Sequence, residues 1–273
     1  MRGPIYENTS RKAAAFVLLA GSIALMPQTG AASSAPAEWH AVSIHGHRIN
    51  YATRGDGPTL VLLHGGGDSG EHSFARQLDI LSERHHLVAP DQVGQGRSPD
   101  ISGALTYTGM MDDTAALLKR LGLKHVDVVG FSDGGILALM LAIRHPELVR
   151  RLVVSGVNIA PDGLNADDLE ELRATQNPKP KTIDEKLAHL WATSPTETEL
   201  SVAMLAKISQ PVLLISGDRD AITLEHTLKI FHALPDAELC VLPGTDHATF
   251  SGRAEWLNPI INAFLERSLG SPR

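Results

Sequence analysis

Short apolar runs alternate with segments of helical periodicity from about Trp39 onward. The runs are too short for helices, and glycine, proline or a polar residue closes each one, as is typical of parallel strands buried on both faces. We expect strands at Leu60–Leu63, His86–Ala89, Val126–Val129, Leu152–Val154, Val212–Ile215 and Leu239–Leu242. We expect helices at Glu71–Leu81, Tyr107–Leu121, Gly134–Arg144, Leu224–Leu234 and Trp256–Leu269. This alternation predicts the α/β class, with a mostly parallel sheet and helices on both faces.

Two segments depart from the alternation. Ala41–Ile44 and His47–Thr53 flank a His-Gly pair and predict an antiparallel hairpin. Residues 160–209 contain no predicted strand, and helices are expected there at Asp167–Ala174, Thr182–Thr193 and Thr196–Ile208. Such an insertion at the carboxyl edge of a sheet is typical of a helical cap over a site. We therefore expect a core of residues 38–159 and 210–273 and a short helical cap of residues 160–209.

The first residues differ in composition from the rest of the chain. Arg11 and Lys12 precede the apolar run Ala13–Met26, and small residues follow as far as Ala37. A basic flank, a short apolar stretch and an Ala-Pro-Ala end predict a secretory signal peptide over residues 1–37. The alternative is an uncleaved membrane anchor, but the run is shorter than the roughly 20 residues that span a bilayer. We expect a periplasmic or secreted protein with no membrane contact after cleavage.

Charge and cysteine usage exclude some classes of partner. The 273 residues carry a net charge of −7 without a charged patch in the sequence. An acidic balance argues against nucleic acid or an anionic membrane as a partner. The single cysteine, Cys240, cannot form an internal disulfide, and its apolar neighbours predict a buried, inert thiol. No feature of the sequence indicates the oligomeric state.

The segment Gly-Phe-Ser-Asp-Gly-Gly at residues 130–135 follows a predicted strand and opens a predicted helix. A G-x-S-x-G nucleophile elbow requires this context, because the turn holds its central residue in a strained conformation. Side chains two positions to either side would collide with the turn or with neighbouring elements. Both of those positions are glycine if Ser132 is central, whereas one is Phe131 if Asp133 is central. We therefore predict Ser132 as a nucleophile.

A serine hydroxyl becomes nucleophilic only with a general base that a third group orients. Among the 13 histidines, His247 alone directly follows the last predicted strand, so we predict it as the base. The orienting carboxylate is Asp218 or Asp220, since both follow the strand Val212–Ile215.

The developing oxyanion of an acyl transfer needs N–H donors, commonly worth about 3 kcal/mol each. The backbone N–H of Asp133, at the start of a helix, is one candidate. The other lies in the glycine run after His64, where the absence of side chains allows an N–H to face the substrate. We expect Gly66 to be this donor and Gly65 to lie beside it at the substrate. This chemistry requires no metal and no cofactor.

These motifs, in this order along the chain, resemble the α/β-hydrolase superfamily over residues 38–273. The resemblance favours Asp220 as the triad acid, because Gly217-x-x-Asp220 matches the family pattern and mirrors the spacing from Gly244 to His247. The elbow is further similar to that of valacyclovir hydrolase-like enzymes, in which the acidic residue after the serine helps to recognise a substrate amino group. For Asp133 this implies substrate binding, and the alternative is a carboxylate that the helix dipole favours.

The resemblance implies a carboxylic ester hydrolase that acts on a small-molecule ester or lactone through a Ser-His-Asp triad and an acyl-enzyme. Lactonases and C–C bond hydrolases use the same triad and remain alternatives, and the glycine run also resembles that of the latter. A non-catalytic ligand receptor on the same fold is a third alternative, which the signal peptide disfavours.

Overall fold

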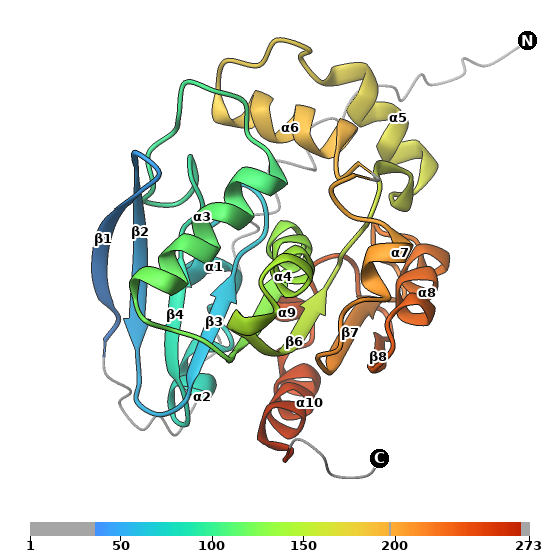
Figure 1. The fold of residues 1–273 in the computed structure, drawn as a ribbon. Helices are drawn as coiled ribbons and strands as arrows, with labels where there is room; N and C mark the ends of the chain where they lie inside the picture. Colours follow the sequence, from blue (N-terminus) through green and yellow to red (C-terminus); the bar gives the residue numbers. More distant parts are fainter. Residues whose placement is uncertain (1–35, 197, 269–273) are drawn as a thin grey trace, which may run out of the picture. The chain divides into compact units, whose positions relative to one another are not determined.

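The computed structural model describes residues 36–196 and 198–268, so all but the end of the expected signal peptide lies outside the described residues. Eight strands form one sheet in the order β1-β2-β4-β3-β5-β6-β7-β8 (Figure 1). The strands are β1 (Glu38–Ile44), β2 (His47–Arg54), β3 (Thr59–Leu63), β4 (His86–Pro90), β5 (Val126–Phe131), β6 (Val149–Ser155), β7 (Val212–Gly217) and β8 (Ala237–Leu242). The predicted α/β fold is confirmed.

The hairpin β1–β2 and the pair β2–β4 are antiparallel, and all other neighbours are parallel. Strand β3 lies between β4 and β5. The next strand in the chain, β4, is added on one side of β3, and the following strand, β5, is added on the other, so the strand order reverses at β3. Ligands of open α/β sheets bind at such a switch point, outside the carboxyl ends of the strands. The glycine run after β3 and the serine turn after β5 both lie at this edge.

The helices match most of the predicted ones. They are α1 (Gly70–Ser73), α2 (Leu78–Ser82), α3 (Tyr107–Arg120), α4 (Asp133–Arg144), α5 (Ala166–Thr175), α6 (Ile183–Thr193), α7 (Val202–Leu205), α8 (Leu224–Ala233), α9 (Thr249–Gly252) and α10 (Ala254–Glu266). No helix of the described ranges is both long and apolar enough to cross a membrane.

Two helix predictions were wrong in extent. The expected helix Glu71–Leu81 is divided into α1 and α2, because the ring of Phe74 packs 5.1 Å from that of Phe250 and its backbone leaves the helical region. The expected helix Thr196–Ile208 is reduced to α7. The turn that begins at Thr196 does not continue into α7, because the backbone of Ser201 between them is extended, with φ −146° and ψ 163°.

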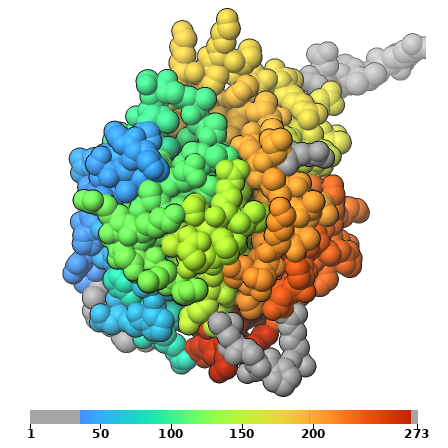
Figure 2. All heavy atoms as spheres, viewed as in Figure 1, coloured from blue at the N-terminus to red at the C-terminus, as the bar shows by residue number. Residues whose placement is uncertain are grey.

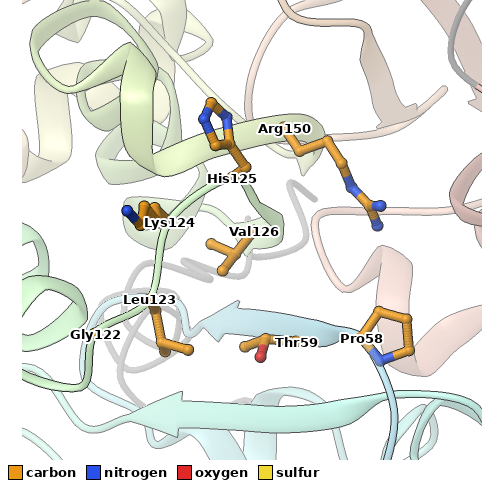
Figure 3. A pocket seen from close by; sticks show the side chains of 8 residues that line it. All are labelled: Pro58, Thr59, Gly122, Leu123, Lys124, His125, Val126 and Arg150. Atoms are coloured by element: carbon orange, nitrogen blue, oxygen red, sulfur yellow. The ribbon is translucent and has the colours of Figure 1, made fainter.

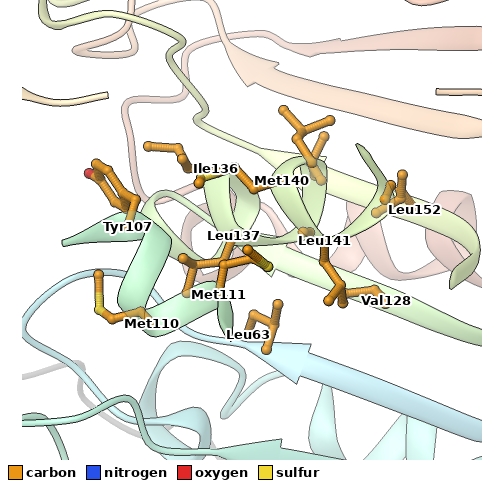
Figure 4. Packing of buried hydrophobic residues seen from close by; sticks show 14 of the residues in the cluster. Leu63, Tyr107, Met110, Met111, Val128, Ile136, Leu137, Met140, Leu141 and Leu152 are labelled. Atoms are coloured by element: carbon orange, nitrogen blue, oxygen red, sulfur yellow. The ribbon is translucent and has the colours of Figure 1, made fainter. Parts of the chain in front are cut away.

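Buried side chains on the two faces of the sheet form separate clusters, because successive residues of a strand point to opposite faces. On one face Leu63 and Val128 pack against α3 and α4, among the side chains that Figure 4 shows. On the other face Leu62 and Val129 pack with apolar residues of α10 and with Phe250. A buried leucine contributes about 2 kcal/mol, so these layers hold the strand ends in fixed positions.

The segment between β6 and β7 contains α5, α6 and α7, and Figure 2 shows its first part in yellow at the top of the view. Helix α6 begins at a capping box in which Thr182 and Glu185 exchange hydrogen bonds. Leu187 and Leu190 of this helix pack into the same cluster as α3 and α4. The Nζ of Lys186 lies 2.8 Å from Oδ1 of Asp100, which ties α6 to the loop after β4.

Candidate active site

Ser132 occupies a sharp turn between β5 and α4, with φ 52° and ψ −119°. Its N–H donates to the carbonyl of Ser155, at the end of the neighbouring strand β6, over 2.8 Å. The flanking glycines leave room for this turn. A methyl group at Gly134 would lie 2.6 Å from the carbonyl oxygen of His64, and one at Gly130 would lie 2.7 Å from Cα of Gly135. Contacts this short explain why glycine stands on both sides of the serine.

The side chains of Ser132, His247 and Asp220 meet at the carboxyl ends of β5, β8 and β7. The Nε2 of His247 lies 3.0 Å from Oγ of Ser132, and its Nδ1 lies 2.7 Å from Oδ1 of Asp220. The Asp220 side chain is fully buried, and the same oxygen accepts the N–H of Ile222 over 3.0 Å. The structure thus brings together the predicted nucleophile, base and acid in the relationship that a catalytic triad requires.

The two candidate acids have different surroundings. Asp218 is exposed, and its Oδ1 accepts the N–H of Thr245 over 3.1 Å. Backbone N–H groups, first that of Gly244 and then that of Thr245, lower the pKa of this carboxyl. Asp218 therefore braces the turn that precedes His247, whereas Asp220 contacts the imidazole directly.

The environment of His247 acts on its pKa in two directions. Burial alone would lower the pKa, but the hydrogen bond that His247 donates to Asp220, together with the charges of Asp220 and Asp133, outweighs burial and raises the pKa above 6.5. The ring of Phe131 packs beside the imidazole, with centroids 5.2 Å apart. An imidazole that is oriented by a carboxylate and made more basic is suited to accept the serine proton.

The glycine run after β3 is held by side chains from neighbouring loops. The N–H of Gly65 donates to Oγ of Ser73 over 3.2 Å, and that of Gly67 donates to Oε1 of Gln95 over 2.7 Å. The Nε2 of His64 accepts the N–H of Gln92, which leaves a protonated Nδ1 to donate to the Gly65 carbonyl. These bonds immobilise both neighbours of Gly66.

The predicted oxyanion donors have their N–H groups unengaged. Neither Gly66 nor Asp133 donates its backbone N–H to an acceptor within residues 36–196 and 198–268. A Cβ at Gly65 would lie 3.5 Å from Cβ of Ser132, so the glycine run passes close to the nucleophile. The N–H groups of Gly66 and Asp133 therefore remain candidates to bind a developing negative charge.

The Asp133 side chain points into the protein and is only 5% exposed as a residue. Its Oδ1 accepts the hydroxyl of Tyr107 over 2.8 Å, and the indole N–H of Trp191 lies 3.1 and 3.0 Å from its two oxygens. Burial raises the pKa of Asp133, while the bonds from Trp191 and Tyr107 act in the opposite direction. A substrate ammonium group would have to share these oxygens with Trp191, so substrate binding by Asp133 stays a prediction.

The sequence model of the alpha/beta hydrolase fold family matches residues 58–180, a range that contains the glycine run and the serine turn. The chain has the alpha/beta hydrolase fold. A 2-hydroxymuconate semialdehyde hydrolase of Pseudomonas putida is 38% identical over 118 residues, which are 41% of this chain and 40% of that enzyme. The serine hydrolase BPHL of Mus musculus is 37% identical over 122 residues, which are 43% of this chain and 42% of that protein.

The matches to these two curated relatives span only about two fifths of the relatives' length. An alpha/beta hydrolase fold protein from Chitinophaga pinensis superposes with a TM-score of 0.71 over 85% of this chain and 98% of its own, at 18% identity. At that identity the likeness shows the fold alone. Asp220 and His247 lie beyond the range of the family match, so their relationship to Ser132 rests on the geometry of this chain.

Three residues of the site were not predicted from the sequence. Gly156 follows β6, and a methyl group there would lie 2.7 Å from Cε1 of His247. Tyr107 and Trp191 hold the Asp133 carboxylate. Gly156 follows a predicted strand, which is a signal that could have identified it. Trp191 lies on α6, in the segment between β6 and β7, where no motif marks it.

A depression at the opposite edge of the sheet makes no contact with these groups. Its lining residues include Thr59, Val126 and Arg150, which lie at the amino ends of β3, β5 and β6, together with Lys124 and His125 from the loop before β5 (Figure 3). The Arg150 guanidinium is engaged by the carboxylate of Asp127, with Nε 2.8 Å from Oδ1. Ser132, Asp220 and His247 lie instead at or just beyond the carboxyl ends of β5, β7 and β8.

Proposed function

We propose that this chain is an exported serine hydrolase that cleaves carboxylic esters through an acyl-enzyme. The observation that carries the proposal is the hydrogen-bonded series from Asp220 through His247 to Ser132, with contacts of 2.7 and 3.0 Å. Two unengaged N–H groups beside the serine supply the other element that acyl transfer needs.

In the first half-reaction, Nε2 of His247 takes the hydroxyl proton of Ser132 as Oγ attacks the ester carbonyl carbon. Asp220 keeps Nδ1 protonated and stabilises the imidazolium that forms. The N–H groups of Gly66 and Asp133 hold the oxyanion of the tetrahedral intermediate. The imidazolium then gives its proton to the leaving alcohol, and Ser132 is left acylated.

In the second half-reaction, water replaces the alcohol. His247 takes a proton from this water, hydroxide attacks the acyl carbonyl, and the same two N–H groups bind the second oxyanion. Return of the proton to Oγ of Ser132 releases the carboxylic acid and restores the enzyme.

The similarity to the 2-hydroxymuconate semialdehyde hydrolase supports a second candidate, cleavage of a C–C bond by the same triad. A cyclic ester, or lactone, is a third substrate type for the same steps. A panel of p-nitrophenyl esters, lactones and vinylogous diketones, followed by product analysis, separates the three. Turnover of esters in preference to the others supports the proposal, and turnover of diketones alone contradicts it.

The triad is tested with purified wild-type protein and Ser132→Ala. A fluorophosphonate should add one covalent group to the wild type and none to the variant, and Ser132→Ala should lose at least about 1,000-fold in kcat. Retained activity in the variant would show that the nucleophile is another residue. Stoichiometric labelling of the wild type without measurable turnover on any substrate would favour the ligand-receptor alternative.

Export is proposed from the composition of residues 1–37. Expression of the full chain in a bacterial host, followed by cell fractionation and intact-mass measurement, tests it. A periplasmic species that has lost about the first 37 residues supports the proposal. An unprocessed chain in the membrane or cytoplasmic fraction contradicts it.

A further inference from the structure

The carboxylate of Asp133 joins three elements that are distant in the sequence. Asp133 opens α4, Tyr107 opens α3, and Trp191 lies on α6 in the segment between β6 and β7. The hydroxyl of Tyr107 donates over 2.8 Å, and the indole N–H of Trp191 lies 3.0 Å from the other carboxylate oxygen. Tyr107 and Asp133 are both almost completely buried. A buried carboxylate with two donors is a strong and geometrically specific connection.

This connection lies one residue from the nucleophile and touches both candidate oxyanion donors. The peptide N–H of Asp133 is the first donor. At Gly66, which carries the second, an added methyl group would overlap the Asp133 carboxylate and would lie 2.6 Å from Cζ2 of Trp191. The Gly66 backbone therefore packs directly on the pair that Asp133 and Trp191 form.

The charge of Asp133 depends on its donors. Burial raises the pKa of this carboxyl, and the bond from Trp191 is the strongest influence that lowers it, ahead of the bond from Tyr107. Burial also raises the pKa of Tyr107 well above 10, so its hydroxyl remains protonated and can donate at every relevant pH. Loss of the indole N–H would remove the side-chain hydrogen bond that lowers the pKa of Asp133 most, and so would destabilise the carboxylate.

Helix α6 has a second attachment away from the serine turn. Lys186 is 4% exposed, and its Nζ lies 2.8 and 2.9 Å from the two oxygens of Asp100 in the loop after β4. Trp191 follows five residues later on the same helix, which is about 1.4 turns, because a helical turn takes 3.6 residues. The helix is thus fixed to the loop after β4 through Lys186 and to the serine turn through Trp191.

We propose that Trp191 is a positioning residue: its hydrogen bond to Asp133 lets the cap helix α6 hold the Asp133 peptide and the Gly66 loop in the geometry that binds the oxyanion. The proposal rests on the proposed hydrolase function. It assigns to Trp191 an effect on the transition state rather than on substrate binding, because both donors engage the charge that develops during reaction.

Two substitutions separate the N–H of Trp191 from its bulk. Trp191→Phe keeps an aromatic ring but has no N–H. Trp191→His places its Nε2–H at the position of the indole N–H, since both nitrogens are two bonds from Cγ. Trp256→Phe is the matched control, because Trp256 is 47% exposed on α10 and takes no part in the site.

On p-nitrophenyl acetate, Trp191→Phe should lower kcat by about 10- to 100-fold with little change in KM, as expected for misplaced transition-state donors. Trp191→His should recover most of that loss, and Trp256→Phe should match the wild type. In an Asp133→Ala background, Trp191→Phe should have less than about a twofold further effect, because the shared bond is already absent. Equal losses in both backgrounds, or a change in KM alone, would overturn the proposal.

Hydrogen exchange supplies a measurement that does not depend on catalysis. Peptides that cover residues 63–67 and 131–135 should exchange faster in Trp191→Phe than in Trp256→Phe. Unchanged exchange in both peptides overturns the positioning role. This result can be obtained even if the chain hydrolyses no ester, so the failure of the proposed function and the failure of this inference are distinguishable. If Trp191→Phe does not fold, Trp191→His is compared with the wild type instead. Amide protection of the two peptides near the wild-type level supports the positioning role. Amide exchange as fast as in Asp133→Ala contradicts it.

Discussion

Because Gly156 has no side chain, the imidazole of His247 can occupy the space beside it. A methyl group on its Cα would lie 2.7 Å from Cε1 and 3.0 Å from Nδ1 of the ring. The residue has φ +63°, a conformation that glycine adopts at little cost. The placement of the proposed base therefore depends on a residue at the end of a different strand, β6, which has no chemistry of its own.

Gly156→Ala should displace the imidazole and lower kcat by about 10- to 100-fold, since a shift of about 1 Å in a catalytic group has this effect. The matched control is Gly122→Ala. Gly122 has a similar φ of +70°, but a methyl group there meets nothing within 4 Å. Both variants carry the same backbone strain, and only the first has the collision. Equal activities for the two variants would show that the contact with His247 is unimportant.

Exchange of a single carboxylate for an amide distinguishes the two acids after β7. Asp220→Asn removes the charge beside His247 and allows the amide to present an N–H to Nδ1, which favours the wrong tautomer. We expect kcat to fall by about 10,000-fold. Asp218→Asn only weakens a turn and should change kcat by less than about tenfold. Steady-state kinetics of the two variants decides, and a larger loss in Asp218→Asn would reverse the assignment.

The pH dependence of hydrolysis should report the raised pKa of His247. Only the neutral imidazole accepts a proton, so kcat/KM should rise with pH through a midpoint above 6.5 and then level off. In Asp220→Asn the hydrogen bond and charge that raise this pKa are lost while burial, which lowers it, remains. The midpoint of the residual activity should therefore move to lower pH. Rates from about pH 5 to pH 9 test this, and a shift in the opposite direction would contradict it.

The ion cluster at the amino edge of the sheet should affect stability and leave the chemistry intact. Asp127 is fully buried on β5, and Arg151, which is 4% exposed, lies 3.1 Å from it. Asp127→Ala leaves a buried guanidinium without its carboxylate, which should lower the free energy of unfolding by about 3–5 kcal/mol. Asp79, whose side chain is 77% exposed, pairs with Arg54, and Asp79→Ala should cost less than about 1 kcal/mol.

Urea unfolding compares these two variants, and kcat measured on the folded fraction should equal that of the wild type in both. A small, equal loss of stability in both would mean that burial of the Asp127 cluster makes no difference. A fall in kcat confined to Asp127→Ala would mean that this edge communicates with Ser132.

Local signals in the sequence were sufficient to identify the strands and the serine turn. Apolar runs such as Leu60–Leu63 must be buried on both faces, and Gly130 and Gly134 around Ser132 satisfy a steric requirement that few residues meet. The ends of helices were less predictable. The expected helix Glu71–Leu81 is broken where Phe74 packs against Phe250. The residues near Phe74 give no indication of a contact so far along the chain.

The sequence by itself determined the α/β class and the residue types available at each strand end, because periodicity and turn sterics act over a few neighbouring residues. Only the tertiary structure decided which carboxylate faces His247, which glycine makes room for its ring, and which side chain of α6 reaches Asp133. Those relationships are distances between segments up to 115 residues apart, such as Ser132 and His247. They arise from the packing of whole layers, which no local pattern encodes.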